Sequence, residues 1–329
     1  YLKETGQLKP EVMAKAETLM ITGYQRELTY RRKDGSFSAF GESDKSGSLW
    51  LTGFVLKTFA QAKGTIYIDD SVLDSAKAWI TKQQQADGSF DSVGFVHHQE
   101  MLGGVQGKKA LTANIAVALL EAGETAASAK TLRYLEGVLD TIDDVYTLAL
   151  TTYALELGKS PRAGAAHAKL MGKAKDSDGG LYWGGDMPQP LPGAEGRGAA
   201  PLAPIRPQRQ PSIAIETTGY ALMALAQHGD RMNASRAARW LVSQRNSSGG
   251  FGSTQDTVVG LQALTRFATD SKSDVDATIT LRAGNWQKVI AVNPANADVL
   301  QVVDAPASDT ITLEAKGQGQ VLVQSVRRF

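Results

Sequence analysis

The chain has 329 residues, of which 42% are apolar and 21% charged, so it can bury one large core or two smaller ones. Its 35 basic side chains balance 34 acidic ones, and a formal charge of +1 provides no field that would attract nucleic acid or an anionic membrane. Because cysteine is absent, disulfides, thiolate nucleophiles and cysteine-ligated metals are excluded within this sequence. We expect a globular protein without a nucleic-acid partner.

The first residues, YLKETGQLKPEV, have neither an initiator methionine nor the pattern of a signal peptide. We therefore expect the chain to be a piece of a longer protein. No apolar run approaches the length that spans a bilayer.

Five segments are apolar almost all round: 49–62, 110–123, 145–158, 215–229 and 254–268. They carry a threonine in register, at Thr52, Thr112, Thr147, Thr218 and Thr257. A helix without a polar face has to be surrounded by protein, so these segments predict buried helices.

Amphipathic helices alternate with the buried ones. The segment 70–85 is an example, with Val72, Leu73, Ala76, Trp79 and Ile80 on one stripe. Two helix types in alternation predict two concentric layers. We expect a mainly α fold, with residues 1–270 forming an α/α toroid of helical hairpins around five or six inner helices.

One unit of helix and turn occurs twice, as AWITKQQQADGSF (78–90) and RWLVSQRNSSGGF (239–251). In both, a tryptophan is followed by glutamine at four residues, glycine at nine and phenylalanine at eleven. Segments 33–40 and 176–183 repeat the turn alone. We expect glycine to adopt a positive φ there and the aromatic residue to return to the core.

Residues 186–212 belong to neither helix type. They contain seven of the eleven prolines and three arginines but almost no large apolar residue. We expect an inserted surface loop between two hairpins. It could be an insertion without a role of its own, which a surface loop accommodates at little entropic cost, or a proline-rich docking site or proteolytic target.

From residue 271 the pattern changes to short β-branched runs separated by Asn, Pro, Gly and Asp, such as VDATITLRA, WQKVIAV, VLQVVDA and DTITLEAK. These runs predict four or five antiparallel strands in residues 271–329. So small a sheet would have open edges, and we expect another segment to complete it.

The other aspartate pairs and histidines of the sequence are interpreted as structural residues. Asp69-Asp70 and Asp143-Asp144 fall at expected helix N-termini, where capping explains them. His167 and His228 are interpreted as surface or C-terminal helix residues. No two histidines have i, i+4 spacing, so we expect neither a metal nor a cofactor.

The segment GFVHHQEMLGG (94–104) holds two adjacent histidines, Glu100 and a Gly-Gly pair. It resembles the thioester domain of the α2-macroglobulin and complement superfamily, including its membrane-anchored and insect members. The similarity extends through YLKETGQL (1–8), GYQRELTYRRKDGSFSAFG (23–41), WLTGFVLKTFAQA (50–62), LTANIAVALLE (111–121), RWLVSQRNSSGGFGSTQDTVVGLQAL (239–264) and LEAKGQGQVLV (313–323).

This resemblance implies a toroid between the two halves of a CUB-type β domain, whose second half would be residues 271–329. It also implies that His98 attacks a thioester to form an acyl-imidazole, with Glu100 assisting transfer to a hydroxyl group. The residues alone favour His98 as a capped loop residue without chemistry. His97 lies outside the matched position.

The family's thioester is made by the cysteine and glutamine of a GCGEQ motif, which this sequence does not contain and which we expect to lie outside it. The resemblance thus implies a secreted, single-use acylating effector or protease trap of innate immunity rather than an enzyme. Its partners would be the macroglobulin domains and first CUB half of the parent protein, and protease or cell-surface targets. Sequons at Asn233 and Asn246 are possible glycosylation sites of such a protein.

Two other functions stay open. One is a scaffold or adhesion member of the same superfamily that has no thioester and binds proteins non-covalently. The other is an α/α-toroid enzyme, which would need opposed carboxylates or a zinc site.

Overall fold

The computed structural model describes residues 8–95, 104–185, 212–246, 249–271, 275–296, 301–306, 310–319, 321 and 323. The chain divides into a larger unit, Lys9–Ala263, and a smaller unit that includes Leu264–Phe329. We call them the helical unit and the β unit, and describe each by itself. The expected insert at 186–212 lies outside the described residues except for Ser212.

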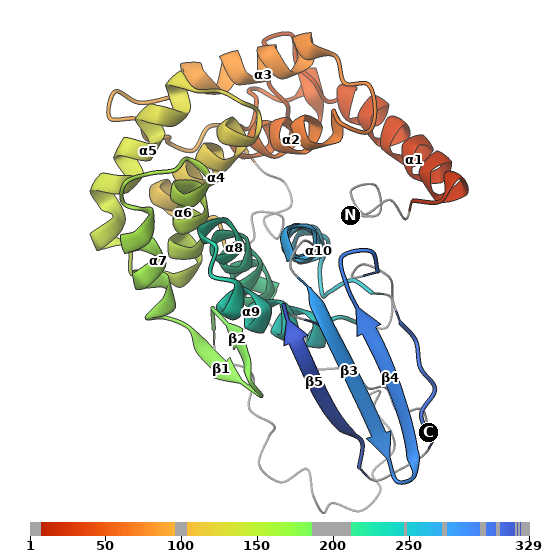
Figure 1. Cartoon of the computed structure of the whole chain (residues 1–329). Coiled ribbons are helices and arrows are strands. Elements are labelled where there is room, and N and C mark those ends of the chain that lie inside the picture. Colours follow the sequence, from red (N-terminus) through yellow and green to blue (C-terminus); the bar gives the residue numbers. More distant parts are fainter. Residues whose placement is uncertain are drawn as a thin grey trace, which may run out of the picture. The chain divides into compact units, whose positions relative to one another are not determined.

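Two layers of helices build the helical unit (Figure 1). The inner layer contains α2 (Leu49–Ala62), α4 (Gly107–Glu121), α6 (Val145–Leu157), α8 (Ser212–His228) and the start of α10 (Thr254–Ser271). The outer helices are α3 (Asp70–Lys82), α5 (Ala126–Val138), α7 (Ala163–Met171) and α9 (Arg231–Ser243). Each packs on the inner helix that precedes it, and consecutive inner helices from α2 to α8 pack on one another. The predicted mainly α array of helical hairpins is confirmed.

The first helix, α1 (Pro10–Leu28), buries no residue fully and lies against α2. Its Tyr24 ring meets Phe59 edge-on, with the centroids 4.9 Å apart. The hydroxyl group of Tyr24 accepts a hydrogen bond from the Asp69 backbone N–H at 3.2 Å.

The apolar patterns explain the layers. Helix α6 buries every residue from Tyr146 to Glu156, as expected for a helix enclosed by protein. Helix α3 instead buries one stripe, consisting of Val72, Leu73, Ala76, Trp79 and Ile80. These are the five residues that the amphipathic pattern predicted.

The threonines in register hold the turns that precede the inner helices. In four hairpins the hydroxyl accepts a backbone N–H at 3.0 Å: Thr52 from Phe37, Thr112 from Phe90, Thr218 from Trp183 and Thr257 from Phe251. All four aromatic side chains are buried. One hydroxyl thus fixes the point at which each turn re-enters the core, and the predicted return of the aromatic residues is confirmed.

Thr147 is the exception. No aromatic turn precedes α6, because α5 continues into a short 3-10 turn at 139–141. The Thr147 backbone N–H is instead capped by Asp144, at 2.7 Å from its Oδ2 atom. Asp69 caps α3 in the same way through Ser71, so both predicted acidic caps are confirmed.

The repeated turns require glycine. Gly88 has a φ of +89°, and a Cβ atom added there would lie 2.3 Å from the Lys130 carbonyl oxygen. Gly35 has a φ of +90° and a similarly close backbone neighbour in Ser75. Positive φ and close approach both exclude a side chain at these positions. The third turn is a hairpin of two short strands, β1 (Lys175–Ser177) and β2 (Gly180–Tyr182).

The β unit contains three described strands, β3 (Asp276–Ala283), β4 (Trp286–Val292) and β5 (Thr312–Gln318), in the antiparallel order β4-β3-β5. Ile279 lies opposite Ile290 on one side and Ala315 on the other. The small core forms around Val275, Ile279 and Val292.

The strand expected in VLQVVDA is wrong for the part that the structure describes, because residues 301–306 form no strand. Pro306, which follows VLQVVDA, has no N–H to donate to a neighbouring strand.

Within the described residues, none of the helices combines the length and apolarity needed to cross a membrane.

Candidate functional site

The residues expected to carry chemistry, His98 and Glu100, lie outside the described residues, as does His97. The structure does describe both flanks of this segment, which end at Phe95 and begin again at Gly104. These flanks and the side chains around them define the candidate site.

The first flank is fixed to the start of α2. The Val93 carbonyl oxygen accepts the Leu49 N–H at 2.9 Å. Gly94 has a φ of +74°, and a Cβ atom added there would lie 2.2 Å from the Gly47 carbonyl oxygen. The chain therefore leaves the turn against the N-terminus of an inner helix, at a point where only glycine fits.

The second flank is fixed between α6 and α8. The buried Gly104 donates its backbone N–H to the carboxylate of Glu216. A Cβ atom added at Gly104 would lie 2.3 Å from the Tyr146 ring. The second glycine of the Gly-Gly pair is thus required by contact with an aromatic ring.

Glu216 is buried, and its carboxyl group therefore has a shifted pKa. The Tyr146 hydroxyl donates to its Oε2 atom at 3.2 Å. Burial raises the pKa of Glu216 to about 7, although the hydrogen bonds from Tyr146 and Gly104 act in the opposite direction. This carboxyl group can therefore bind or release a proton near neutral pH.

A buried ammonium group lies near this carboxylate. Burial lowers the pKa of Lys57 on α2, while the charges of Glu121 and Glu216 oppose that shift. Glu121 in turn accepts the Tyr153 hydroxyl at 2.9 Å. Sequence analysis missed this cluster of charged groups and phenols. The sequence feature that could have indicated the cluster is a single Lys or Glu inside a segment that is otherwise apolar, as with Lys57 and Glu216.

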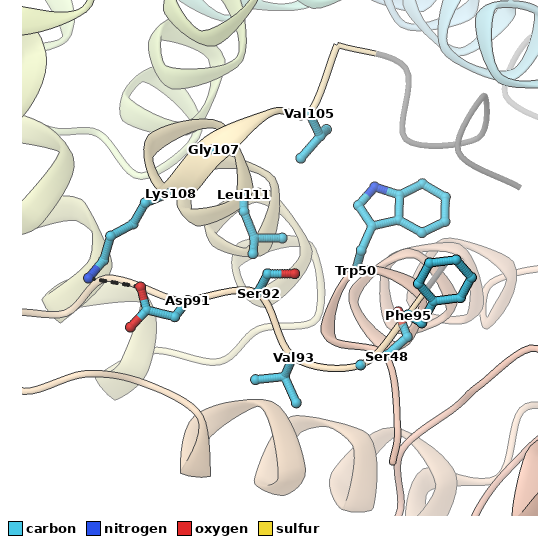
Figure 2. A pocket seen from close by; sticks show the side chains of 11 residues that line it. Ser48, Trp50, Asp91, Ser92, Val93, Phe95, Val105, Gly107, Lys108 and Leu111 are labelled. Atoms are coloured by element: carbon cyan, nitrogen blue, oxygen red, sulfur yellow. Dashed lines mark ion pairs between the residues drawn. The ribbon is translucent and has the colours of Figure 1, made fainter. Parts of the chain in front are cut away.

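A pocket of about 320 Å³ opens between the same flanks (Figure 2). Val93, Gly94 and Phe95 line it from the first flank, and Val105 lines it from the second. The Lys108 ammonium pairs with the Asp91 carboxylate at its edge, at 3.1 Å.

Helix direction adds to the electrostatics of this region. Each inner helix is followed by an outer helix that returns the chain, so the inner helices run in the same direction. Their N-terminal ends, which carry the partial positive charge of the helix dipole, therefore gather where the turns and both flanks lie. This arrangement favours negative charge beside these turns.

The described residues contain no cluster of three side chains that could hold a metal ion. His167 and His228 stack with ring centroids 4.0 Å apart. His167 bonds Asp230 at 3.1 Å, and His228 bonds Glu156 at 2.8 Å. His228 ends α8, as its interpretation as a C-terminal helix residue implied, but sequence reasoning did not predict the pairing.

Both sequon asparagines use their amide nitrogens in local hydrogen bonds. Asn233 Nδ2 donates to Asp230 at 2.9 Å, and Asn246 Nδ2 donates to the Phe251 carbonyl oxygen at 2.5 Å. Glycosylation at either position stays a prediction, and it would require these bonds to rearrange.

The two-layered array of helical hairpins places the helical unit in the class of α/α-toroid domains. The sequence matches the family described as "A-macroglobulin TED domain" over residues 1–267, and the chain belongs to this family. Ovostatin of Gallus gallus is 36% identical over 343 aligned positions, which cover 100% of this chain and 22% of ovostatin. The chain thus spans about a fifth of the length of this curated relative, and the predicted family is confirmed.

Proposed function

We propose that the protein carrying this chain is a secreted α2-macroglobulin-like or complement-like effector of innate immunity, and that this domain attaches it covalently to its target. The acceptors would be hydroxyl groups on a target surface or a trapped protease. The thioester-forming cysteine and glutamine would lie outside this chain. The family match over residues 1–267 supports the class of protein.

One observation carries the proposal for the site. The described flanks on either side of the segment with His98 and Glu100 are held at the N-terminal ends of inner helices, Val93 by Leu49 and Gly104 by Glu216. A reactive imidazole benefits from fixed flanks, because a nucleophile acts efficiently only when it is held close to the reacting carbonyl.

The chemistry would proceed in two steps. A nitrogen of His98 attacks the thioester carbonyl carbon, which forms the acyl-imidazole and releases the cysteine thiolate. A hydroxyl oxygen of the target then attacks the same carbon, and its proton passes to the thiolate while the imidazole leaves. An ester and a free thiol remain, with Glu100 orienting the imidazole or the incoming hydroxyl. Each molecule would react once, as a trap or tag rather than an enzyme.

The partners would be the macroglobulin domains and first CUB half of the parent protein, together with its protease or cell-surface targets. Residues 271–329 would be the second half of the CUB-type domain. The open edges of the sheet, formed by β4 and β5 within the described strands, are consistent with completion by another segment.

His98→Asn in the full-length protein tests the role of the imidazole. After proteolytic activation with glycerol and methylamine both present, we expect the parent protein to label mainly glycerol and the variant to label mainly methylamine. His97→Asn is the matched control and should keep the preference for hydroxyl groups. Equal shifts in both variants, or none in either, would contradict a specific role for His98.

A further inference from the structure

One side chain of the pocket lining, Trp50, has a buried donor that finds no acceptor among the described residues. Trp50 on α2 is 4% exposed, and among the described residues its indole Nε1–H has no hydrogen-bond partner. Figure 2 shows the indole nitrogen on the edge of the ring nearer Val105, which also lines the pocket. A buried donor normally has a partner, so a ligand oxygen would supply one once a small rotation of the indole opens this N–H to the pocket.

Other polar groups of the lining provide both hydrogen-bond donors and acceptors. The Asp91 carboxylate accepts hydrogen bonds, the Lys108 ammonium donates them, and the Ser92 hydroxyl does both. Asp91 and Lys108 form an ion pair, so their charges cancel at the edge of the pocket. The lining therefore favours a neutral ligand that can donate and accept.

The rest of the lining is apolar. Val105 and Leu111 are buried beneath the pocket, and the exposed Phe95 stands at its edge. The pocket's volume of about 320 Å³ falls at the lower end of the range, about 300–1,000 Å³, that small-molecule sites occupy. A small ring with one apolar face and several hydroxyl groups matches this combination.

We propose that this pocket binds a sugar ring of the hexopyranose type reversibly. The apolar face of the ring would lie against Val105, Leu111 and Phe95. One ring hydroxyl would accept the Trp50 N–H, and others would bond Asp91 and Ser92.

Reversible binding goes beyond the proposed covalent attachment and does not need it. A further consequence rests on the proposed function: the bound sugar would place hydroxyl groups beside both flanks of the segment that contains His98. The pocket would then favour glycans over other hydroxyl-bearing acceptors.

Binding can be measured by NMR on the full 329-residue chain with 15N-labelled tryptophan. The chain has five tryptophans, and Trp50→Phe assigns the indole signal of the pocket. We expect methyl α-D-mannopyranoside or methyl α-D-glucopyranoside to shift the Trp50 signal saturably and to leave the other four unchanged. Open-chain sorbitol should produce no saturable shift.

Two substitutions in the lining test the contacts. Asp91→Asn and Ser92→Ala should each weaken sugar binding about five- to tenfold, as expected for the loss of one hydrogen bond. Asp140→Asn changes a carboxylate that pairs with Arg162 elsewhere and should leave affinity unchanged. Absence of a sugar-dependent shift, equal affinity in all variants, or preferential binding of cyclohexanol would overturn the proposal.

The experiments distinguish failure of the sugar-binding proposal from failure of the proposed covalent function. Sugar binding without a thioester in the full-length protein would leave the pocket standing and remove the covalent function. A thioester without sugar binding would do the reverse.

Discussion

The two ends of the inner helices use polar groups differently. At the N-terminal end, threonine hydroxyls fix four turns, and the Glu216 carboxylate holds the backbone of Gly104. At the C-terminal end, polar side chains bond one another, as in the two histidine–carboxylate pairs around His167 and His228.

The polar groups at the two ends therefore have different roles: those at the N-terminal end position turns, and those at the C-terminal end hold helices together. Bonds from side chains to the backbone fix where a turn or flank lies, so the N-terminal end can present a segment in one place. Bonds between side chains at the other end join neighbouring helices without fixing a loop. We therefore expect substitutions at the N-terminal end to cost more stability, because they leave buried backbone groups unpaired.

The largest effect is expected at Gly88. Gly88→Ala combines a positive φ with a Cβ position 2.3 Å from a backbone oxygen, so we expect a loss of about 3 kcal/mol or more in the free energy of unfolding. Gly123→Ala is the matched control, because φ is +71° there but no atom lies within 4 Å. Urea unfolding should show a loss of only about 1 kcal/mol for the control. Equal losses would show that the close approach in the turn is unimportant.

Glu216 should make stability depend on pH. Burial raises the pKa of Glu216 in the folded state to about 7 from the ordinary value of 4.5, so the folded state keeps a proton that the unfolded state has lost. Its contribution is fully present below pH 4.5 and is lost as the pH rises through about 7, by up to about 3 kcal/mol.

Glu216→Gln should remove this component. Urea unfolding of both proteins between pH 4.5 and 8 gives the comparison, since other titrating groups contribute to both curves. If the free energy of unfolding changed with pH in parallel for both proteins, the raised pKa of Glu216 would be contradicted.

Thr112→Val removes the hydroxyl that accepts the Phe90 N–H and keeps the side-chain shape. We expect a loss of about 2 kcal/mol, because a buried backbone donor becomes unpaired. Thr147→Val is the control, since Thr147 is similarly buried but holds no aromatic turn. Its cost in thermal or urea unfolding should be clearly smaller, and a cost equal to that of Thr112→Val would refute the role of the hydroxyl in the turn.

The smallest effect is expected for the histidine stack. A double-mutant cycle of His167→Ala and His228→Ala should give a coupling energy of about 0.5–1.5 kcal/mol, as for other aromatic pairs. A second cycle, between His228→Ala and Thr52→Val in a different hairpin, should be additive. Additivity in both cycles would mean that the stack contributes no interaction of its own.

Repetition made much of the fold predictable. The apolar segments at 49–62 and 145–158 agree with α2 and α6 to within one residue, and the threonines marked the register. Four of these threonines proved to hold a turn, because the aromatic turn and the hydroxyl recur together. Thr147 shares the register without the turn, since no Gly-aromatic pattern precedes it.

Features that occur once were not predicted. His167 and His228 are 61 positions apart in the sequence, and only the packing of α7 and α8 brings their rings together. Glu216 was hidden within an apolar helix, where its role depends on Gly104 from a distant turn. The weak strand pattern at 301–306 could not reveal whether a partner strand was available. His98 and Glu100 were identified by resemblance, and their roles stay predictions.

The most direct test of the proposed function is intact mass spectrometry of the full-length, uncleaved protein before and after methylamine treatment, with free thiols counted in both samples. The proposal expects one amine adduct per chain and one newly exposed thiol, which together report an internal thioester. No adduct and no new thiol on freshly prepared protein would contradict it and favour the non-covalent scaffold, in which His98 has no acyl-transfer role.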